Sequence, residues 1–330
     1  MYKDEFADTE EEALEWVSEI VDGKLATVRR PPELLTRDVV AKAINSERDA
    51  GRASIHGGAY LDISWRDPEQ VRKKLPGMYH QFKELAAVDI TTEKMEVGPT
   101  AHYVMGGIKV HPETQETTVP RMFAAGEAAT GLHGANRLGG NSLSDLIVFG
   151  KIAGENAAMI AKDLDGFLVI DQKQIKEVIE ETLAPLNRQN GENPAKVVED
   201  LREMMQHKVG IIRTEKLLKE ALKDLEELEI REKNTSVGDS KIYNPGWHQA
   251  LEIGAMIDVS KMCALAALHR EESRGGHTRD DFPVPDYKYW GKMNSVITKK
   301  DVMSIEHRRY PSIDNELKQL LDIEDLHEEE

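Results

Sequence analysis

The stretch "FAAGEAATGLHGANRLGGNSLSDL" at residues 123–146 carries the strongest structural signal in the chain. Small residues lead to Gly126-Glu127, a glycine-rich loop follows, and helical spacing begins at Ser142. A carboxylate at the end of a strand suits hydrogen bonds to the hydroxyls of a ribose or ribityl chain, although Glu127 can equally be a surface acid. Four loop glycines permit positive φ angles and a close approach of the backbone to a ligand: Gly131, Gly134, Gly139 and Gly140.

The helix after this loop is expected to begin at Ser142, because Ser142 and Asp145 form a Ser-x-x-Asp capping pattern. The free N–H groups and partial positive charge of its N-terminus can stabilise an anion. Arg137 lies just before that terminus, and its guanidinium offers a planar fork for a carboxylate. The expected core-facing positions are small or apolar: Leu143, Leu146, Ile147, Gly150, Ala153, Gly154 and Ala157.

A histidine upstream completes a candidate anion site. His102 lies four residues before the paired glycines Gly106 and Gly107 in "GPTAHYVMGGI". Alone it is more often a structural histidine, but together with Arg137 it forms a candidate clamp for an anion.

A third polar group, "ESRGGHTRDDFP" at residues 272–283, follows a long apolar helix. It contains Arg274, His277 and Arg279 beside two aspartates. Clustered opposite charges in this position more often hold structural elements together than perform chemistry, so we expect a structural role.

Composition limits the classes of function. The 43 basic and 60 acidic side chains give a net charge of −17, which argues against nucleic acid as a general partner. The single cysteine, Cys263, excludes a disulfide framework and a cysteine metal cluster within the chain, and we expect it to be a buried small residue. No apolar run approaches the roughly 20 residues that span a bilayer, and the start lacks the pattern of a signal peptide. We therefore expect a chain that is neither inserted nor exported by itself.

Periodicity divides the chain into a mixed region and a helical region. Helices are expected at 8–21 and 35–51, with Thr36 as N-cap and Gly51 as the stop, and a strand at 57–64. Short strands are expected between 97 and 127. After 166 the pattern indicates a bundle of amphipathic helices around the apolar helix "LEIGAMIDVSKMCALAALHR". From Pro283 the chain mixes prolines, aromatics and charges, and we expect its end, "LLDIEDLHEEE", to be a frayed acidic tail.

Three motifs in this order, "HYVMGGI", "AAGEAATGLHGANRLGGNSL" and "ESRGGHTRDDFP", resemble the flavoprotein subunit of succinate dehydrogenase and fumarate reductase. "LTRDVVAKAI" and "LDIS" are similar to its cap-domain segments, and 243–276 is similar to its long closing helix. The resemblance implies a mixed α+β fold, with remnants of the FAD-binding and cap domains followed by a helical bundle. Its implied domains are a cap segment at 1–96, the C-terminal part of the FAD-binding domain at 97–165, a helical domain at 166–282 and an extension at 283–330.

The same resemblance implies site residues and a reaction. His102 and Arg137 would bind the dicarboxylate, while Glu127, Ser142 and Leu143 would contact FAD. The implied reaction interconverts succinate and fumarate, with hydride passing between the dicarboxylate and the flavin and electrons passing to an iron–sulfur subunit. This reaction belongs to electron transport and the tricarboxylic acid cycle. The implied location is cytoplasmic, at the inner face of a membrane, with anchor subunits as indirect partners.

The sequence departs from the family at its start. No Gly-x-Gly-x-x-Gly motif follows an opening strand, so the family's N-terminal FAD-binding half is expected to be absent, as is the segment with its proton-shuttle arginine. Arg37 and Arg52 lie outside the corresponding segment, and no catalytic residue is assigned. We expect this chain alone to bind little FAD and to be inactive. A catalytically silent fragment that docks a partner remains an alternative, as does an enzyme similar to L-aspartate oxidase, which shares "HGANRL" and "ESRG".

Overall fold

The computed structural model describes residues 37–311 except 167, 168 and 239, and the chain forms two compact units, Met1–His102 and Tyr103–Glu330. Each unit is described here by itself. The helix expected at 8–21 and the Thr36 N-cap lie outside the described residues.

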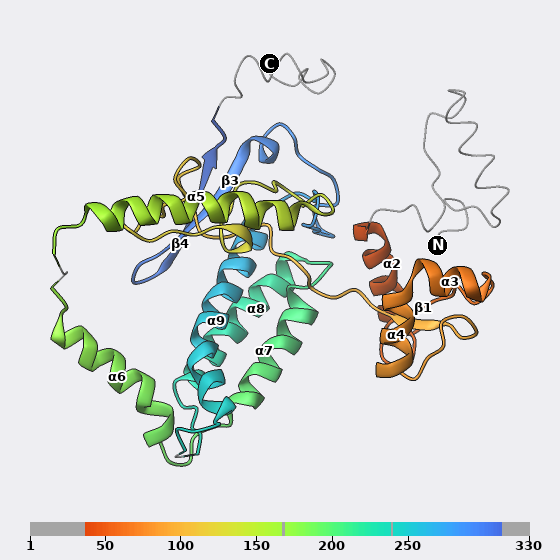
Figure 1. The fold of residues 1–330 in the computed structure, drawn as a ribbon, viewed down its shortest axis with the longest axis horizontal. Coiled ribbons are helices and arrows are strands. Elements are labelled where there is room, and N and C mark those ends of the chain that lie inside the picture. The colour runs from red at the N-terminus through yellow and green to blue at the C-terminus, as the bar shows by residue number, and fades with distance from the viewer. Residues whose placement is uncertain (1–36, 167–168, 239, 312–330) are drawn as a thin grey trace. The chain divides into compact units, whose positions relative to one another are not determined.

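From residue 37 on, the first unit contains short helices and a small two-stranded sheet (Figure 1). Helix α2 (Arg37–Asp49) confirms the helix expected at 35–51, and Gly51 follows it with a φ of 73°. Strand β1 (Ala59–Leu61) pairs antiparallel with β2 (Met95–Val97), so the expected strand forms but is shorter than its pattern. Helices α3 (Pro68–Lys74) and α4 (Pro76–Leu85) lie between the two strands in sequence. The core of this unit is Val71, Ile90 and Met95.

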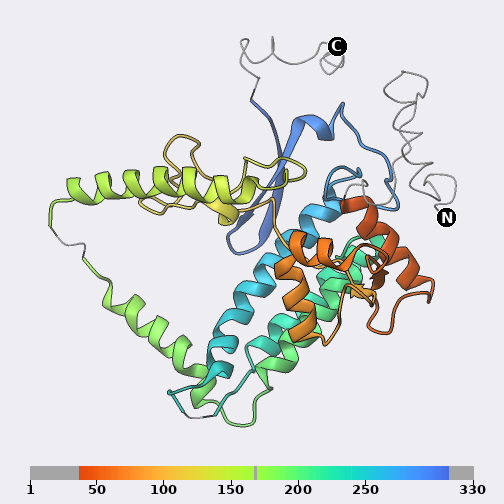
Figure 2. The same ribbon diagram turned by 45° about the vertical axis from the view of Figure 1, so that its right-hand side comes forward.

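The second unit contains the expected helical bundle. Helices α7 (Pro194–Lys208), α8 (Glu215–Glu232) and α9 (Pro245–His269) lie side by side in both ribbon views (Figure 1, Figure 2), and α6 (Gln172–Asn187) meets α9. Side chains of Asn193, Thr214 and Asn244 cap the first turns of α7, α8 and α9 by accepting backbone N–H bonds. The buried faces of α7, α8 and α9 form one apolar cluster that includes Val197, Leu201, Leu218, Leu225, Ile253 and Ile257.

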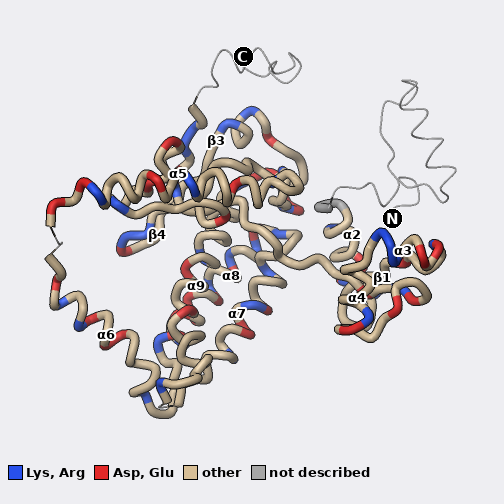
Figure 3. The backbone as a smooth tube through the Cα atoms, in the orientation of Figure 1, with Lys and Arg blue, Asp and Glu red and all other residues tan. Residues whose placement is uncertain are grey.

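Helix α9 is central to this bundle because it contacts α6, α7, α8 and the C-terminal strands. Its burial is less complete than its apolar sequence predicts, since Leu251 and Val259 are exposed. Acidic and basic residues are interspersed along α6, α7 and α8 (Figure 3), with pairs such as Lys196–Asp200 at 2.8 Å. These exposed pairs add little stability individually, so the apolar cluster holds the bundle together.

A β-hairpin follows the bundle, in the extension for which the sequence analysis predicts no elements. Strands β3 (Met293–Lys299) and β4 (Met303–Arg309) pair antiparallel over their full length, after the 3₁₀ turn η3 (Trp290–Lys292). Arg270, at the end of α9, donates to the carbonyl oxygen of Trp290 at 2.9 Å. The buried Trp290 ring lies edge-to-face on His307 of β4. The extension therefore contains a regular hairpin that the sequence analysis does not predict, and the acidic tail expected after it lies outside the described residues.

The short strands expected between 97 and 127 form only in part. Besides β2, this region has isolated bridges, such as Ile108 with Ala129 and Glu116 with Phe123. Gln115 and Arg121 have positive φ angles, which are not the φ angles of a β-strand, so extended strands are interrupted at both positions. Gly107 is required where the chain passes Ala128, because a Cβ there would lie 2.7 Å from the Ala128 carbonyl oxygen.

Helix α5 (Asn141–Asp163) confirms the helix after the glycine loop but corrects its details. It begins one residue before Ser142, and its N-cap is Gly140 in the left-handed region, with no side-chain cap bond. The Ser-x-x-Asp cap is therefore wrong. Within the described chain the expected core face is largely exposed, since Leu143 is 67% and Ile147 73% exposed, whereas Ala153 is buried.

Among the helices that the structure describes, none is both long and apolar enough to cross a membrane.

Candidate functional site

The loop between the 3₁₀ turn η2 (Gly126–Ala128) and α5 is the centre of the candidate site. Ile108 N donates to Ala128 O and Thr130 N donates to Ile108 O, so the segment that starts at Tyr103 runs beside η2. Gly126 has a φ of 67°, and a Cβ there would lie 2.5 Å from Leu146, which explains how closely η2 packs on α5. Three of the four loop glycines adopt the expected positive φ, at Gly131, Gly134 and Gly140.

Arg137 is half-buried in this loop. Its Nη1 donates to the neighbouring carbonyl oxygen of Leu138 at 3.2 Å, and its guanidinium carbon lies 4.8 Å from the centre of the Tyr103 ring. Its Nε is buried and has no hydrogen-bond partner in the described chain. A buried unpaired donor on a cation is unfavourable, and a bound anion would relieve it.

Three polar side chains from separate segments meet beside Arg137. Tyr103 Oη lies 3.0 Å from His133 Nε2 and 3.2 Å from Asp145 Oδ2, and His133 Nε2 lies 3.3 Å from the same carboxylate oxygen. The side chains of His133 and Asp145 are each 6% exposed. Burial raises the pKa of Tyr103, and its hydrogen bond to Asp145 adds to this. The hydroxyl therefore keeps its proton and donates a hydrogen bond to the carboxylate.

The start of α5 and η2 supply further polar groups. Glu127 in η2 is exposed, and its Oε1 accepts the Val104 N–H at 2.9 Å. Ser142 and Leu143 occupy the first turn of α5, where the glycine cap leaves the helix N-terminus without a side-chain acceptor. This arrangement places a carboxylate, a helix N-terminus and an exposed apolar side chain on neighbouring segments. Together they can hold a ligand that has hydroxyls, a negative charge and an apolar ring.

The turn after α9 contacts the same loop. Gly276 N donates to the Ala135 carbonyl oxygen at 3.0 Å, and Gly275 adopts a φ of 60°. A Cβ on Gly275 would lie 2.3 Å from that oxygen. The 272–283 motif thus supports the backbone two residues before Arg137.

The charged residues of that motif join helix ends, as expected for a structural role. The buried Arg279 donates to the carbonyl oxygens of Ala267 and Leu268 at the end of α9 and pairs with Asp281 at 2.7 Å. Asp281 in turn accepts the backbone N–H of Glu215 at the start of α8, at 2.7 Å.

His277, in the same motif, is held between two arginines. Its Nδ1 lies 2.9 Å from Arg213 Nη1, and its Nε2 lies 3.1 Å from the Arg270 carbonyl oxygen. Burial lowers the pKa of His277 to about 4. The ring is therefore neutral at pH 7, which suits a structural residue.

His102 is exposed and is the last residue of the first unit, while Arg137 lies in the second. Its convergence with Arg137 on one anion therefore stays a prediction.

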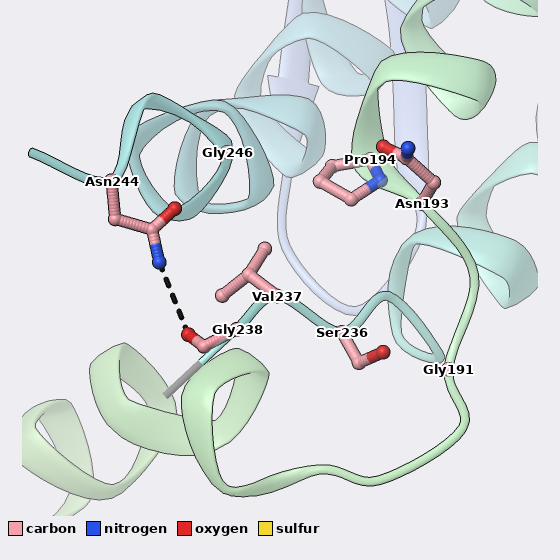
Figure 4. Close-up of a pocket in the computed structure, with 8 residues that line it drawn as sticks. All are labelled: Gly191, Asn193, Pro194, Ser236, Val237, Gly238, Asn244 and Gly246. Atoms are coloured by element: carbon pink, nitrogen blue, oxygen red, sulfur yellow. Dashed lines mark hydrogen bonds between the residues drawn. The ribbon is translucent and has the colours of Figure 1, made fainter. Parts of the chain in front are cut away.

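A separate cavity of about 320 Å³ lies at the N-terminal ends of α7 and α9 (Figure 4). Its lining includes Asn193, Pro194, Ser236 and Asn244, and Asn244 donates across it to the Gly238 carbonyl oxygen at 3.1 Å. None of its lining residues is titratable, so it offers no group for acid–base chemistry.

The sequence analysis proposes Arg137, Glu127 and the start of α5 as site residues, and these stay predictions. It does not name Tyr103 or His133, and it interprets Asp145 only as part of a helix cap. His133 lies inside the quoted loop and Tyr103 next to His102, yet neither has a sequence pattern of its own. Their role depends on contacts between residues 30 and 42 positions apart.

Comparisons with known proteins show the family to which the chain is related. A family model of the FAD-binding domain matches residues 21–143, and one of the fumarate reductase flavoprotein C-terminus matches residues 198–320. An uncharacterized FAD-dependent oxidoreductase of Methanocaldococcus jannaschii is 40% identical over 86% of this chain and 50% of its own length. A chain of the CoM/CoB fumarate reductase of Methanothermobacter marburgensis is 39% identical over 78% of this chain and 46% of its own.

A solved structure of Mycobacterium smegmatis Sdh1 in complex with UQ1 has 44% identity and a TM-score of 0.82, covering 92% of this chain and 52% of that chain. The chain thus spans about half the length of the relatives that it matches. The matched domains identify FAD as the cofactor and confirm the mixed fold. The chain belongs to the flavoprotein-subunit family of succinate dehydrogenase and fumarate reductase.

Proposed function

We propose that this chain forms the dicarboxylate-binding part of an enzyme that interconverts succinate and fumarate. The observation that carries the proposal is Arg137, a half-buried cation whose Nε has no partner in the described chain and whose Nη1 bonds only its own loop. A carboxylate is the anion whose geometry matches a guanidinium fork, and a four-carbon dicarboxylate carries two of them.

His102 is proposed to bind the same dicarboxylate, on the basis of the resemblance alone. The domain bounds given above are proposed on the same basis.

Glu127, Ser142 and Leu143 are proposed to hold FAD. Glu127 is an exposed acceptor suited to ligand hydroxyls, and the first turn of α5 suits negative charge on the ligand. The exposed Leu143 offers an apolar contact. FAD, when bound, supplies the two-electron redox chemistry of the reaction. The protein's part is to bind the dicarboxylate, orient it and offset its charge.

The proposed partners are an iron–sulfur subunit that takes up the electrons and, through it, membrane anchor subunits. The proposed location is therefore the cytoplasmic face of a membrane. The proposed partners and location rest on the family alone. This chain spans about half of its relatives' length, and its own contacts carry no argument for either.

The test is to isolate the enzyme that contains this chain and to measure its flavin content and its turnover with a chemical electron acceptor. The proposal predicts flavin absorption, oxidation of succinate and reduction of fumarate. A flavin-free protein without turnover would favour the silent, partner-docking alternative. Oxidation of L-aspartate instead of succinate would favour the L-aspartate oxidase alternative.

A further inference from the structure

Arg137 has few contacts that fix its side chain. Its hydrogen bond to the Leu138 carbonyl oxygen lies within its own loop, and Nε has no partner in the described chain. The glycines around it leave the loop backbone with unusual conformational freedom. A carboxylate clamp requires a guanidinium that is already oriented, because a misplaced group loses much of its effect on the transition state.

The Tyr103 ring is the surface on which the guanidinium rests. The distance of 4.8 Å from the Arg137 guanidinium carbon to the ring centre lies within the range of cation–π attraction. Stacking on an aromatic face restricts the plane of a guanidinium and leaves its outer N–H groups available.

The Tyr103 ring is itself fixed through its hydroxyl, which contacts Asp145 and His133. The Tyr103 hydroxyl donates to the buried carboxylate of Asp145 on α5, and His133 Nε2 lies 3.0 Å from the same hydroxyl. The His133 ring also meets the Tyr103 ring edge-to-face, with centres 5.2 Å apart. Polar contacts of this kind, buried away from water, fix a side chain more firmly than exposed ones.

We propose that Tyr103 is a positioning residue for Arg137, held in place by Asp145 and His133. This inference rests on the proposed function, because it needs Arg137 to bind the dicarboxylate. Tyr103 itself touches neither the dicarboxylate nor the cofactor in this account. It acts by keeping the guanidinium in one orientation before the ligand arrives.

The test compares four variants in the flavin-loaded enzyme: Tyr103→Leu, which removes the ring; Tyr103→Phe, which keeps the ring and loses the hydroxyl; Arg137→Lys; and Tyr60→Leu. Tyr60 is the matched control because its ring lies 4.1 Å from Lys94 Nζ in the other unit. The readout is the Kd of fumarate, followed by the change in flavin absorbance on titration, together with flavin content and melting temperature.

We expect Tyr103→Leu to raise the Kd about tenfold, the scale of a cation–π contact in a partly desolvated site. Tyr103→Phe should raise it no more than about threefold, since its ring face remains. Flavin content should stay unchanged in both, and Tyr60→Leu should leave the Kd unchanged. Equal effects of the leucine and phenylalanine variants, or a Kd unchanged in both, would overturn the positioning role.

If Tyr103→Leu loses flavin or does not fold, Asp145→Asn decides the question, because asparagine has the shape of aspartate and weakens the bond to the hydroxyl. It should raise the Kd by no more than the roughly threefold limit set for Tyr103→Phe in the wild-type background, and it should have little added effect in Tyr103→Phe, where that bond is already absent. Equal effects in both backgrounds would overturn the proposal. An unchanged Kd in Arg137→Lys would instead overturn the proposed function, so the two failures are distinguishable.

Discussion

The backbone N–H of Gly276 donates a 3.0 Å hydrogen bond to the carbonyl oxygen of Ala135, two residues before Arg137. The turn that follows the bundle's central helix therefore supports the loop that carries the proposed substrate arginine. Because α9 is packed into the apolar cluster of the bundle, this contact ties the loop to a well-buried element. The stability of the bundle and the geometry of the candidate site are consequently linked.

Gly275→Ala should damage that link. The substitution places a Cβ 2.3 Å from the Ala135 carbonyl oxygen, so the loop must move. We expect dicarboxylate turnover to fall roughly tenfold to a hundredfold, the scale of a displaced binding group. Steady-state kinetics with succinate at full flavin content checks this.

Gly51→Ala is the matched control for Gly275→Ala. Gly51 has a comparable φ of 73°, but in the part of the chain that the structure describes nothing lies within 4 Å of a Cβ added there. Both variants should lose about 1 kcal/mol of stability from backbone strain, while only Gly275→Ala loses turnover. Equal turnover in the two variants would show that the Gly275 turn does not support the site.

The stability of the folded chain should decrease as the pH falls from about 6.5 toward 4. The folded pKa of His277 is about 4 and the ordinary value is 6.5, so in this window the unfolded chain binds a proton that the folded chain does not. The contribution is fully present above pH 6.5 and changes by up to about 1.4 kcal/mol per pH unit below it. Urea unfolding at several pH values measures the slope.

His277→Gln provides the comparison for that slope. A glutamine amide can accept from Arg213 and donate to the Arg270 carbonyl oxygen, but it does not titrate. The variant should therefore lack the His277 part of the slope. Parallel pH dependences of the two proteins would mean that His277 titrates normally in the folded chain.

Ile253→Ala should destabilise the bundle by about 2–5 kcal/mol, because Ile253 is fully buried in the cluster of α7, α8 and α9. Ile230→Ala is the matched control, since Ile230 on α8 is 72% exposed. It should change the free energy of unfolding by about 0.5 kcal/mol or less. Similar losses in the two variants would contradict the described core.

The sequence predicts the bundle helices well because their signals are local. Apolar residues three and four positions apart set the buried faces of α7 and α8. The glycine loop is equally local, because its turns need residues that tolerate positive φ.

Features that depend on distant partners are not predictable in this way. The Ser-x-x-Asp pattern predicts a helix cap, yet Asp145 bonds Tyr103, a residue 42 positions away. Strand β4 alternates between half-buried and exposed residues, but the hairpin depends on its pairing with β3 and on Trp290 and Arg270, which the alternation of one strand does not identify as partners. The apolar face of α5 has the spacing of a buried helix face but is largely exposed in the described chain. Periodicity shows that a helix face is apolar, but it does not show which other segment packs on that face.

Arg137→Lys is the most direct measurement of the central claim. Lysine keeps the charge but loses the two-pronged fork, so an interaction that strengthens in the transition state is lost. The account predicts an enzyme with nearly full flavin content whose succinate turnover falls roughly a hundredfold or more, the scale of one preorganised electrostatic group. Full flavin content with near-normal turnover would contradict the clamp, and loss of flavin and turnover together would return Arg137 to a structural role in the glycine loop.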